Sequence, residues 1–214
     1  MNPYLIDKLP PKRVYSWVLT CDPNKRHGGL LTAIDHLGNR FYVAEHYQED
    51  VPDRVHAEAY HVMLNARKLR PQDVSMFADP GGAGAQAIVN LSDHGIYCRA
   101  VKKDAGSVKT SIEVIRRAAT PDPMHSHPTA KTDDGKPVMG APYTYFLTSL
   151  HSEWEADGVE FRESRLMWEL RQYRQKLKMP PDTPLKEKDD LVDCMRYVEL
   201  VRPFTPAPAD TRVE

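Results

Sequence analysis

Four acidic residues in distant parts of the chain have the side chains best suited to joint chemistry. Asp22 and Asp79 each follow a short apolar run, whereas Asp190 and Asp193 stand three residues apart near the end of the sequence. Carboxylates brought together from distant elements repel one another unless cations lie between them, and oxygen-only ligation suits Mg²⁺ or Mn²⁺. The pattern predicts a centre for divalent metal ions that acts on phosphodiester bonds.

Each of these acids also has a simple structural explanation. Asp22 and Asp79 both precede proline and so suit turns, and Asp190 is well placed as a first-turn acid of a helix. Their combination favours function, because two acids end strands and two more share one face of a late helix. In hydrolysis by two ions, the ions lie ~3.5–4 Å apart. Asp22 is then the natural bridging carboxylate, with Asp79 holding one ion and the helical pair the other.

The elements that must position these acids follow from hydrophobic periodicity and turn residues. Strands are predicted at residues 14–22, 74–78, 96–101 and 143–150, with a hairpin over 28–47. Helices are predicted at residues 51–69, 85–91, 107–119, 161–177 and 189–201. This order predicts an α/β fold with a mixed central sheet, a three-strand meander followed by parallel strands, flanked by helices.

The last predicted helix explains how two acids can face the strand ends. At about 100° per residue, Asp190 and Asp193 share one helical face with Tyr197. A separate apolar stripe, which includes Leu191 and Cys194, is expected to pack on the sheet. The two carboxylates then lie at its edge.

In this arrangement the sequence resembles the ribonuclease H-like superfamily, and within it the nuclease domain of phage terminase large subunits. The resemblance spans roughly residues 14 to 200. It rests on the segments Thr20-Cys21-Asp22-Pro23, Phe77-Ala78-Asp79-Pro80, Lys102–Val108, Leu166–Tyr173 and Asp189–Tyr197.

The resemblance implies a ribonuclease H-like fold and a Mg²⁺- or Mn²⁺-dependent endodeoxyribonuclease with two ions at Asp22, Asp79, Asp190 and Asp193. Such an enzyme cuts concatemeric double-stranded viral DNA during genome packaging in the host cytoplasm. Its expected partners are a terminase ATPase domain or subunit, the small terminase subunit and the portal. The chain has no GxxxxGK[ST] motif, so translocation is not assigned to it, and as an isolated domain it is expected to be monomeric.

Basic residues near the second acid are candidates for DNA contact. Lys102, Lys103 and Lys109 follow the strand expected beside Asp79, and such residues bind phosphates without sequence preference. The Pro-rich residues 120–142 are either a hairpin that flanks the DNA or a surface loop. The expected organisation is an N-terminal extension (1–13), a nuclease domain (14–201) that includes this insertion, and a disordered tail (202–214).

Composition excludes several other classes. The 29 basic and 30 acidic residues nearly cancel, which argues against a binder that relies on bulk positive charge. No run approaches the roughly 20 apolar residues of a membrane span, so a cytoplasmic protein without membrane partners is expected. Three cysteines without a CxxC pair give no disulfide framework or zinc knuckle. The histidines of His125-Ser126-His127 are expected to be exposed loop residues.

Two alternative functions stay open. A stand-alone RuvC-like Holliday junction resolvase of the same superfamily would use the same acids and cut branched DNA as a dimer. A non-catalytic nucleotide-binding or packaging scaffold domain would use the acids only as turns and caps. For the latter, residues 82–87 match the GxGxxA pattern of dinucleotide-binding loops, although a close helix–sheet contact explains the same glycines.

Overall fold

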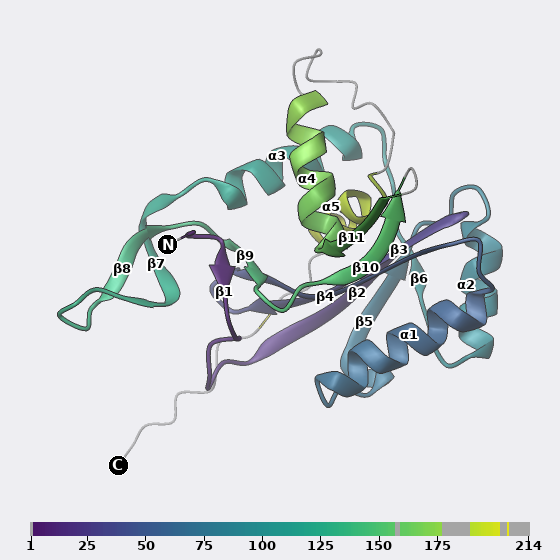
Figure 1. The fold of residues 1–214 in the computed structure, drawn as a ribbon, viewed down its shortest axis with the longest axis horizontal. Helices are drawn as coiled ribbons and strands as arrows, with labels where there is room; N and C mark the ends of the chain where they lie inside the picture. The colour runs from purple at the N-terminus through teal and green to yellow at the C-terminus, as the bar shows by residue number, and fades with distance from the viewer. Residues whose placement is uncertain (1, 157–158, 177–188, 202–204, 206–214) are drawn as a thin grey trace.

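The computed structural model describes residues 2–156, 159–176, 189–201 and 205. Seven strands form one mixed sheet in the order β1-β9-β4-β3-β2-β5-β6 (Figure 1). Their bounds are β1 Leu5–Ile6, β2 Tyr15–Pro23, β3 Arg26–Asp35, β4 Arg40–Glu49, β5 Val74–Ala78, β6 Arg99–Ala100 and β9 Thr144–Leu147. The helices are α1 Asp53–Ala66, α2 Gly84–Asp93, α3 Ser107–Ala119, α4 Arg165–Lys176 and α5 Asp190–Val201.

Strand β2 is the centre of the sheet. It pairs antiparallel with β3 along its whole length and parallel with β5, so both of its edges are hydrogen-bonded. Its C-terminal half is buried on both faces, which explains why residues 18–21 read as a nearly continuous apolar run. The predicted mixed sheet, with a meander of β2, β3 and β4 followed by the parallel strands β5 and β6, is confirmed.

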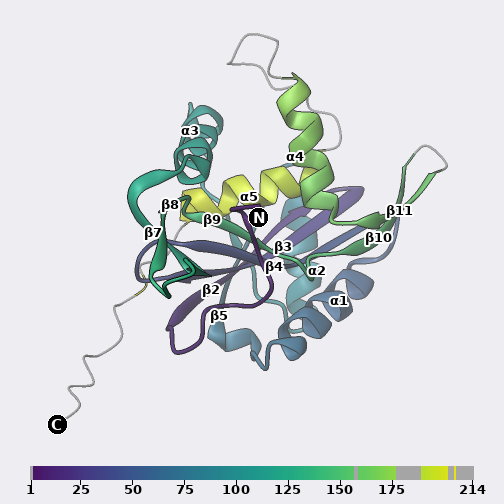
Figure 2. The same ribbon diagram turned by 60° about the vertical axis from the view of Figure 1, so that its left-hand side comes forward.

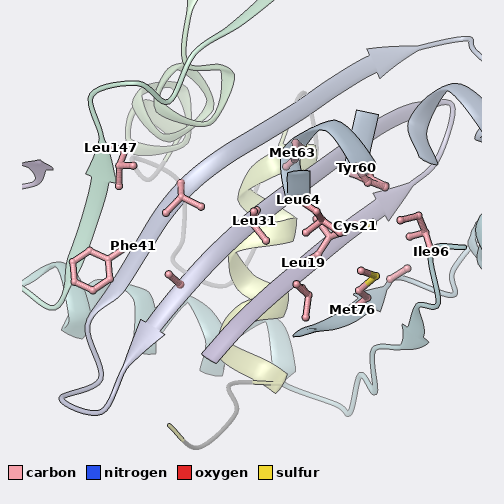
Figure 3. Close-up of a cluster of buried hydrophobic side chains, with 14 of the residues drawn as sticks. Leu19, Cys21, Leu31, Phe41, Tyr60, Met63, Leu64, Met76, Ile96 and Leu147 are labelled. Atoms are coloured by element: carbon pink, nitrogen blue, oxygen red, sulfur yellow. The ribbon is translucent and has the colours of Figure 1, made fainter. Parts of the chain in front are cut away.

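The helices cover the two faces of the sheet unequally. Helices α1 and α2 pack together on one face, and α5 packs on β2 and β3 from the other, with α3 and α4 against α5 (Figures 1 and 2). The larger apolar core lies under α1, where Leu19, Leu31 and Leu64 are buried (Figure 3). Because α5 packs on β2 and β3, its contact with these two strands positions its first-turn acids.

Three predicted elements had wrong boundaries. The strand predicted at 143–150 is limited to β9, Thr144–Leu147. Strand β6 covers only Arg99–Ala100 instead of 96–101. The helix predicted at 161–177 starts at Arg165, because Val159–Glu163 forms strand β11 paired with β10 (Ser152–Ala156). The helix start is fixed by the carboxylate of Glu45, which accepts hydrogen bonds from the Arg165 and Leu166 amides at 2.6 and 3.2 Å.

The N-terminal and Pro-rich segments take regular structure. Within residues 1–13, strand β1 pairs with β9 at the sheet edge. Residues 120–142 form a hairpin of β7 (Asp122–Lys131) and β8 (Pro137–Ala141). The tail expected at 202–214, except for Thr205, lies outside the described residues.

The β7–β8 hairpin begins at the end of the sheet opposite Asp22. His125 Nε2 lies 2.8 Å from Oδ1 of Asn39, which belongs to the turn between β3 and β4. The other end of β3 carries Gly28, the residue paired with Asp22. The hairpin therefore starts at the end of the sheet away from Asp22, and its contact with DNA stays a prediction. Figure 1 shows β7 and β8 on the opposite side of the molecule from α2.

Helices α4 and α5 are joined by a buried carboxylate. Glu169 accepts hydrogen bonds from the Leu191 and Val192 amides at the start of α5, at 2.8 and 3.0 Å, and from Arg165 Nε at 2.9 Å. The Arg165 guanidinium lies over the rings of three aromatic residues, Tyr47, Trp154 and Trp168. Burial raises the pKa of Glu169 to about 8, although Arg165 opposes this rise. Glu169 thus accepts hydrogen bonds from two first-turn amides of α5 that have no partner within the helix. In this way it fixes where that helix begins.

We predict that Glu169→Ala lowers the free energy of unfolding by about 3–5 kcal/mol, because it leaves the buried Arg165 and two helix amides without their partner. Urea denaturation checks the loss. Glu58→Ala is the matched control, since Arg54–Glu58 has the same i,i+4 spacing but both side chains are mostly exposed. Its expected cost is below about 0.5 kcal/mol. Equal losses in the two variants would contradict the role given to Glu169.

Candidate active site

Strand register brings Asp22 and Asp79 side by side. Asp22 is paired with Gly28 on β3, and its neighbour Cys21 is paired with Ala78 on β5. The Asp79 amide continues this ladder by donating to the Cys21 carbonyl at 3.0 Å. Residues at matched positions of adjacent strands point to the same face. Both acids therefore belong to the face that α5 covers.

Helix α5 approaches this strand end closely because residue 28 is glycine. A Cβ atom on Gly28 would lie 3.2 Å from the backbone carbon and oxygen of Asp190, tighter than an ordinary contact. Deeper along the same face, Thr20 Oγ1 donates to the Cys194 carbonyl at 2.9 Å. The first turn of α5, with Asp190 and Asp193, thus lies directly beside Asp22.

The four predicted acids share one electrostatic environment. The pKa of Asp22 is raised to about 8, chiefly by burial and then by the charges of Asp193, Asp79 and Asp190, while Lys103 lowers it. Burial also raises the pKa of Asp190, against the opposing charge of Arg26. The structure therefore brings together the residues named from the sequence.

Three of the four acids already have a protein cation. Lys103 pairs with Asp79, Arg196 pairs with Asp193, and Arg26 Nε lies 3.7 Å from Asp190 Oδ2. Among the described residues, Asp22 alone of the four forms no ion pair.

The hydrogen bonds at Asp22 and Asp79 show the effect of this difference. Asp22 Oδ1 accepts a 2.7 Å hydrogen bond from the neutral amide of Asn24. At Asp79, burial works to raise the pKa, but hydrogen bonds from Lys103, the Gly81 amide and Tyr197 outweigh it and lower the pKa. Ionised Asp22 would therefore be the carboxylate of the site whose charge is least compensated by protein cations in the described part of the chain.

The donor chemistry fits divalent cations, but the arrangement is not a finished metal centre. Asp190 Oδ2 is buried and accepts no hydrogen bond, so it has an oxygen available for an ion. However, no group of three or more His, Cys, Asp or Glu side chains within the described ranges is arranged to hold a metal. Three of the four carboxylates, those of Asp79, Asp190 and Asp193, are instead paired with protein cations.

The three lysines named from the sequence lie near this edge in different ways. Lys103 reaches Asp79, whereas Lys102 is exposed beside it and Lys109 is exposed in the first turn of α3. Binding of DNA by these residues stays a prediction. The sequence interpretation missed Arg26 and Glu169. Glu169 could have been found, since it stands three residues after Leu166 and four before Tyr173, on the apolar side of its helix.

The glycine pattern at residues 82–87 is explained by packing. A Cβ atom on Gly84 would lie 1.9 Å from the Asp79 carbonyl oxygen, so only glycine allows α2 to start against the end of β5. This close approach fixes the turn that carries Asp79. It removes the reason to assign a dinucleotide to this loop.

The histidines do not belong to the acidic site. Strand alternation turns His27 away from Asp22 and Gly28 toward α1, where Nε2 lies 2.7 Å from the Tyr60 hydroxyl and the ring stacks on His56. His46 Nε2 lies 2.8 Å from His56 Nδ1. His125 and His127 are also buried, so the interpretation as exposed loop residues was wrong.

This cluster of His27, His46 and His56 predicts a pH dependence. Burial lowers the pKa of all three, that of His46 to about 4, although Asp53 opposes the shift at His56. The folded protein then binds fewer protons than the unfolded chain below pH 6.5, so this contribution to stability falls as the pH falls. Relative to His46→Gln, the wild type should lose about 2–3 kcal/mol between pH 6.5 and 4.

Denaturation of both proteins across this pH range tests the prediction. Taking the difference between them cancels the contribution of Asp22, which has a raised pKa and acts in the opposite direction. A difference in unfolding free energy that does not vary with pH would show that His46 is not held neutral by the fold.

Comparison with known proteins shows the fold. No protein-family model matches the chain, and no curated protein matches its sequence. Among solved structures, the P22 large terminase nuclease domain is similar with a TM-score of 0.60 and 13% identity, over 98% of this chain and 93% of that one. The large terminase of a thermophilic bacteriophage is similar with a TM-score of 0.58 and 12% identity. The match covers 96% of this chain, which spans 44% of the thermophilic phage protein. The chain therefore has the fold of large-terminase nuclease domains.

Proposed function

We propose that the chain is the nuclease part of a phage large terminase and acts as a divalent-metal-dependent DNA endonuclease. The observation that carries the proposal is the convergence of Asp22, Asp79, Asp190 and Asp193 at one edge of a sheet with the terminase nuclease fold. Repulsion among partly buried carboxylates favours cation binding there.

In this function the four acids would hold two Mg²⁺ or Mn²⁺ ions. When bound, the ions supply an activated water nucleophile and stabilise charge on the leaving oxygen. Asp22 is suited to the bridging position, because it lies between Asp79 and the α5 acids and has no protein cation among the described residues. Asn24 holds one Asp22 oxygen in place. Lys102, Lys103 and Lys109 would bind the DNA backbone beside the acids.

The biological setting follows from the same proposal. The substrate is concatemeric double-stranded DNA in the host cytoplasm, and the partners are a terminase ATPase, the small terminase subunit and the portal. In the described part of the chain, no helix has the length and apolar character required to cross a bilayer.

We predict that Asp22→Asn and Asp193→Asn each lower Mn²⁺-dependent cleavage of plasmid DNA at least about 100-fold, because each removes a charged ligand of the ions. Gel analysis of cleavage with Mn²⁺ and with EDTA measures the effect. Asp93→Asn, a change at an exposed acid of α2, is the control and should keep wild-type activity. Full activity of both site variants would rule out the proposed metal centre.

Asp22→Asn should also stabilise the metal-free protein. The buried carboxyl group faces three other acids, so its replacement by a neutral amide is expected to raise the free energy of unfolding by about 1–3 kcal/mol. Thermal denaturation in EDTA measures this gain, and addition of Mn²⁺ should stabilise the wild type but not the variant. A metal-free variant less stable than the wild type would contradict the assigned repulsion.

The choice of DNA substrate separates terminase from resolvase. We expect the protein to cut linear duplex and a four-way junction of equal length at comparable rates. Gel analysis of both labelled substrates under the same Mn²⁺ conditions makes the comparison. Cleavage confined to the junction would favour the resolvase alternative instead.

A further inference from the structure

Lys103 occupies the carboxylate that one metal ion would need. Its ammonium group pairs with Asp79 Oδ2 and lies 3.2 Å from the Tyr197 hydroxyl, which itself donates to Asp79 Oδ2 at 2.8 Å. The second oxygen, Asp79 Oδ1, accepts the Gly81 amide at 2.9 Å. Both oxygens of Asp79 are therefore engaged with the protein, and an ion cannot use Oδ2 while the ammonium group stays there.

Of the three cations at the site, Lys103 is the one best able to leave. Arg196 is buried, and its Nε also donates to Ser111 Oγ at 3.2 Å. Arg26 lies 3.7 Å from Asp190 and blocks that carboxylate less closely. The Lys103 side chain, in contrast, is 35% exposed and lies in the loop between β6 and α3. Its flexible stem can swing from Asp79 into solvent without opening the core.

Tyr197 also contacts this ammonium group and helps to fix its position. Lys103 Nζ lies 4.9 Å from the centre of the Tyr197 ring, within the range of a cation–π contact, besides its contact with the hydroxyl. The ring is fixed because Tyr197 is fully buried in α5. Asp79 from β5 and Tyr197 from α5 thus form one binding site for a single positive charge.

We propose that Lys103 is a built-in counterion that competes with the divalent metal for Asp79, and that metal binding releases it to bind a phosphate of the DNA. The inference rests on the proposed function, because it takes Asp79 as a metal ligand. In the metal-free state, Lys103 would hold the Asp79 carboxylate in position. Contact with DNA alone would not require this role. Metal and DNA binding then support each other, since an ion at Asp79 makes the ammonium group available to phosphate.

The test is the Mn²⁺ affinity of the whole chain, measured by isothermal titration calorimetry without DNA. Lys103→Met keeps the length of the stem but removes the charge, so it should tighten Mn²⁺ binding about tenfold or more. Lys25→Met is the matched control, because it removes a positive charge from the turn after Asp22 while the Lys25–Asp50 pair is exposed. Its effect on the Mn²⁺ affinity should stay within about twofold.

A second measurement follows DNA binding by fluorescence anisotropy of a labelled duplex. Both proteins carry Asp190→Asn, which is chosen to slow cleavage. In this background Mn²⁺ should increase the affinity for DNA, and the addition of Lys103→Met should remove that increase. Lys103→Arg keeps the charge and should bind Mn²⁺ no more tightly than the wild type. This variant also keeps the inference testable if Lys103→Met does not fold, because tighter Mn²⁺ binding by Lys103→Arg would overturn it.

The outcomes separate the inference from the proposed function. If the wild type cleaves DNA with Mn²⁺ but Lys103→Met binds Mn²⁺ no more tightly than Lys25→Met does, the counterion role is wrong and the nuclease stands. If the wild type neither binds Mn²⁺ nor cleaves DNA, both are wrong. Tighter binding of Mn²⁺ by Lys103→Met alone supports the inference.

Discussion

Repulsion among four carboxylates is the constraint on which the rest of this structure depends. Asp22, Asp79, Asp190 and Asp193 come from three separate elements and meet where burial weakens the screening of charge by water. A fold cannot keep such a group together unless packing elsewhere holds each element in place. The close seat of α5 on Gly28, the start of α2 against β5 and the pairing of β2 with both neighbours supply that restraint.

The restraint on α5 comes from outside the sheet. Glu169 of α4 binds the first amides of α5, and Glu45 of β4 binds the first amides of α4. Two buried carboxylates therefore form a chain of contacts from the central meander, through α4, to the turn that carries Asp190. In both cases the carboxyl oxygens accept hydrogen bonds from first-turn amides that have no partner within their own helix. The position of Asp190 thus depends on two other buried acids, Glu45 and Glu169.

Much of this architecture could be predicted from the sequence, and the failures have physical causes. The apolar run before Asp22 and the spacing of Asp190 and Asp193 are local signals, so the strand, the helix and the helical face were all predicted. The start of α4 depends on Glu45, about 120 residues away, and no local pattern contains that contact. The histidine cluster likewise arises only when β3, β4 and α1 come together.

The cations of the site illustrate the same limit. Lys103 was named as a candidate for DNA contact, because its place after the strand next to Asp79 is visible in the sequence. Its pairing with Asp79 and Tyr197 requires α5 to be in position, and Arg26 reaches Asp190 only across the end of β3. Sequence spacing can therefore place a charged residue at an edge of a sheet, but the residue with which it pairs depends on tertiary packing.

The pairing of Asp22 with Gly28 has a further consequence for how this region can change in evolution. Along β3, His27 faces α1 while Gly28 faces α5, so the sheet separates a neutral imidazole cluster from the acidic edge by the thickness of one strand. A single-residue insertion or deletion within β3 would exchange the two faces. It would put an imidazole under the first turn of α5 and a glycine under His56. The length of this strand and the glycine at residue 28 are therefore both constrained.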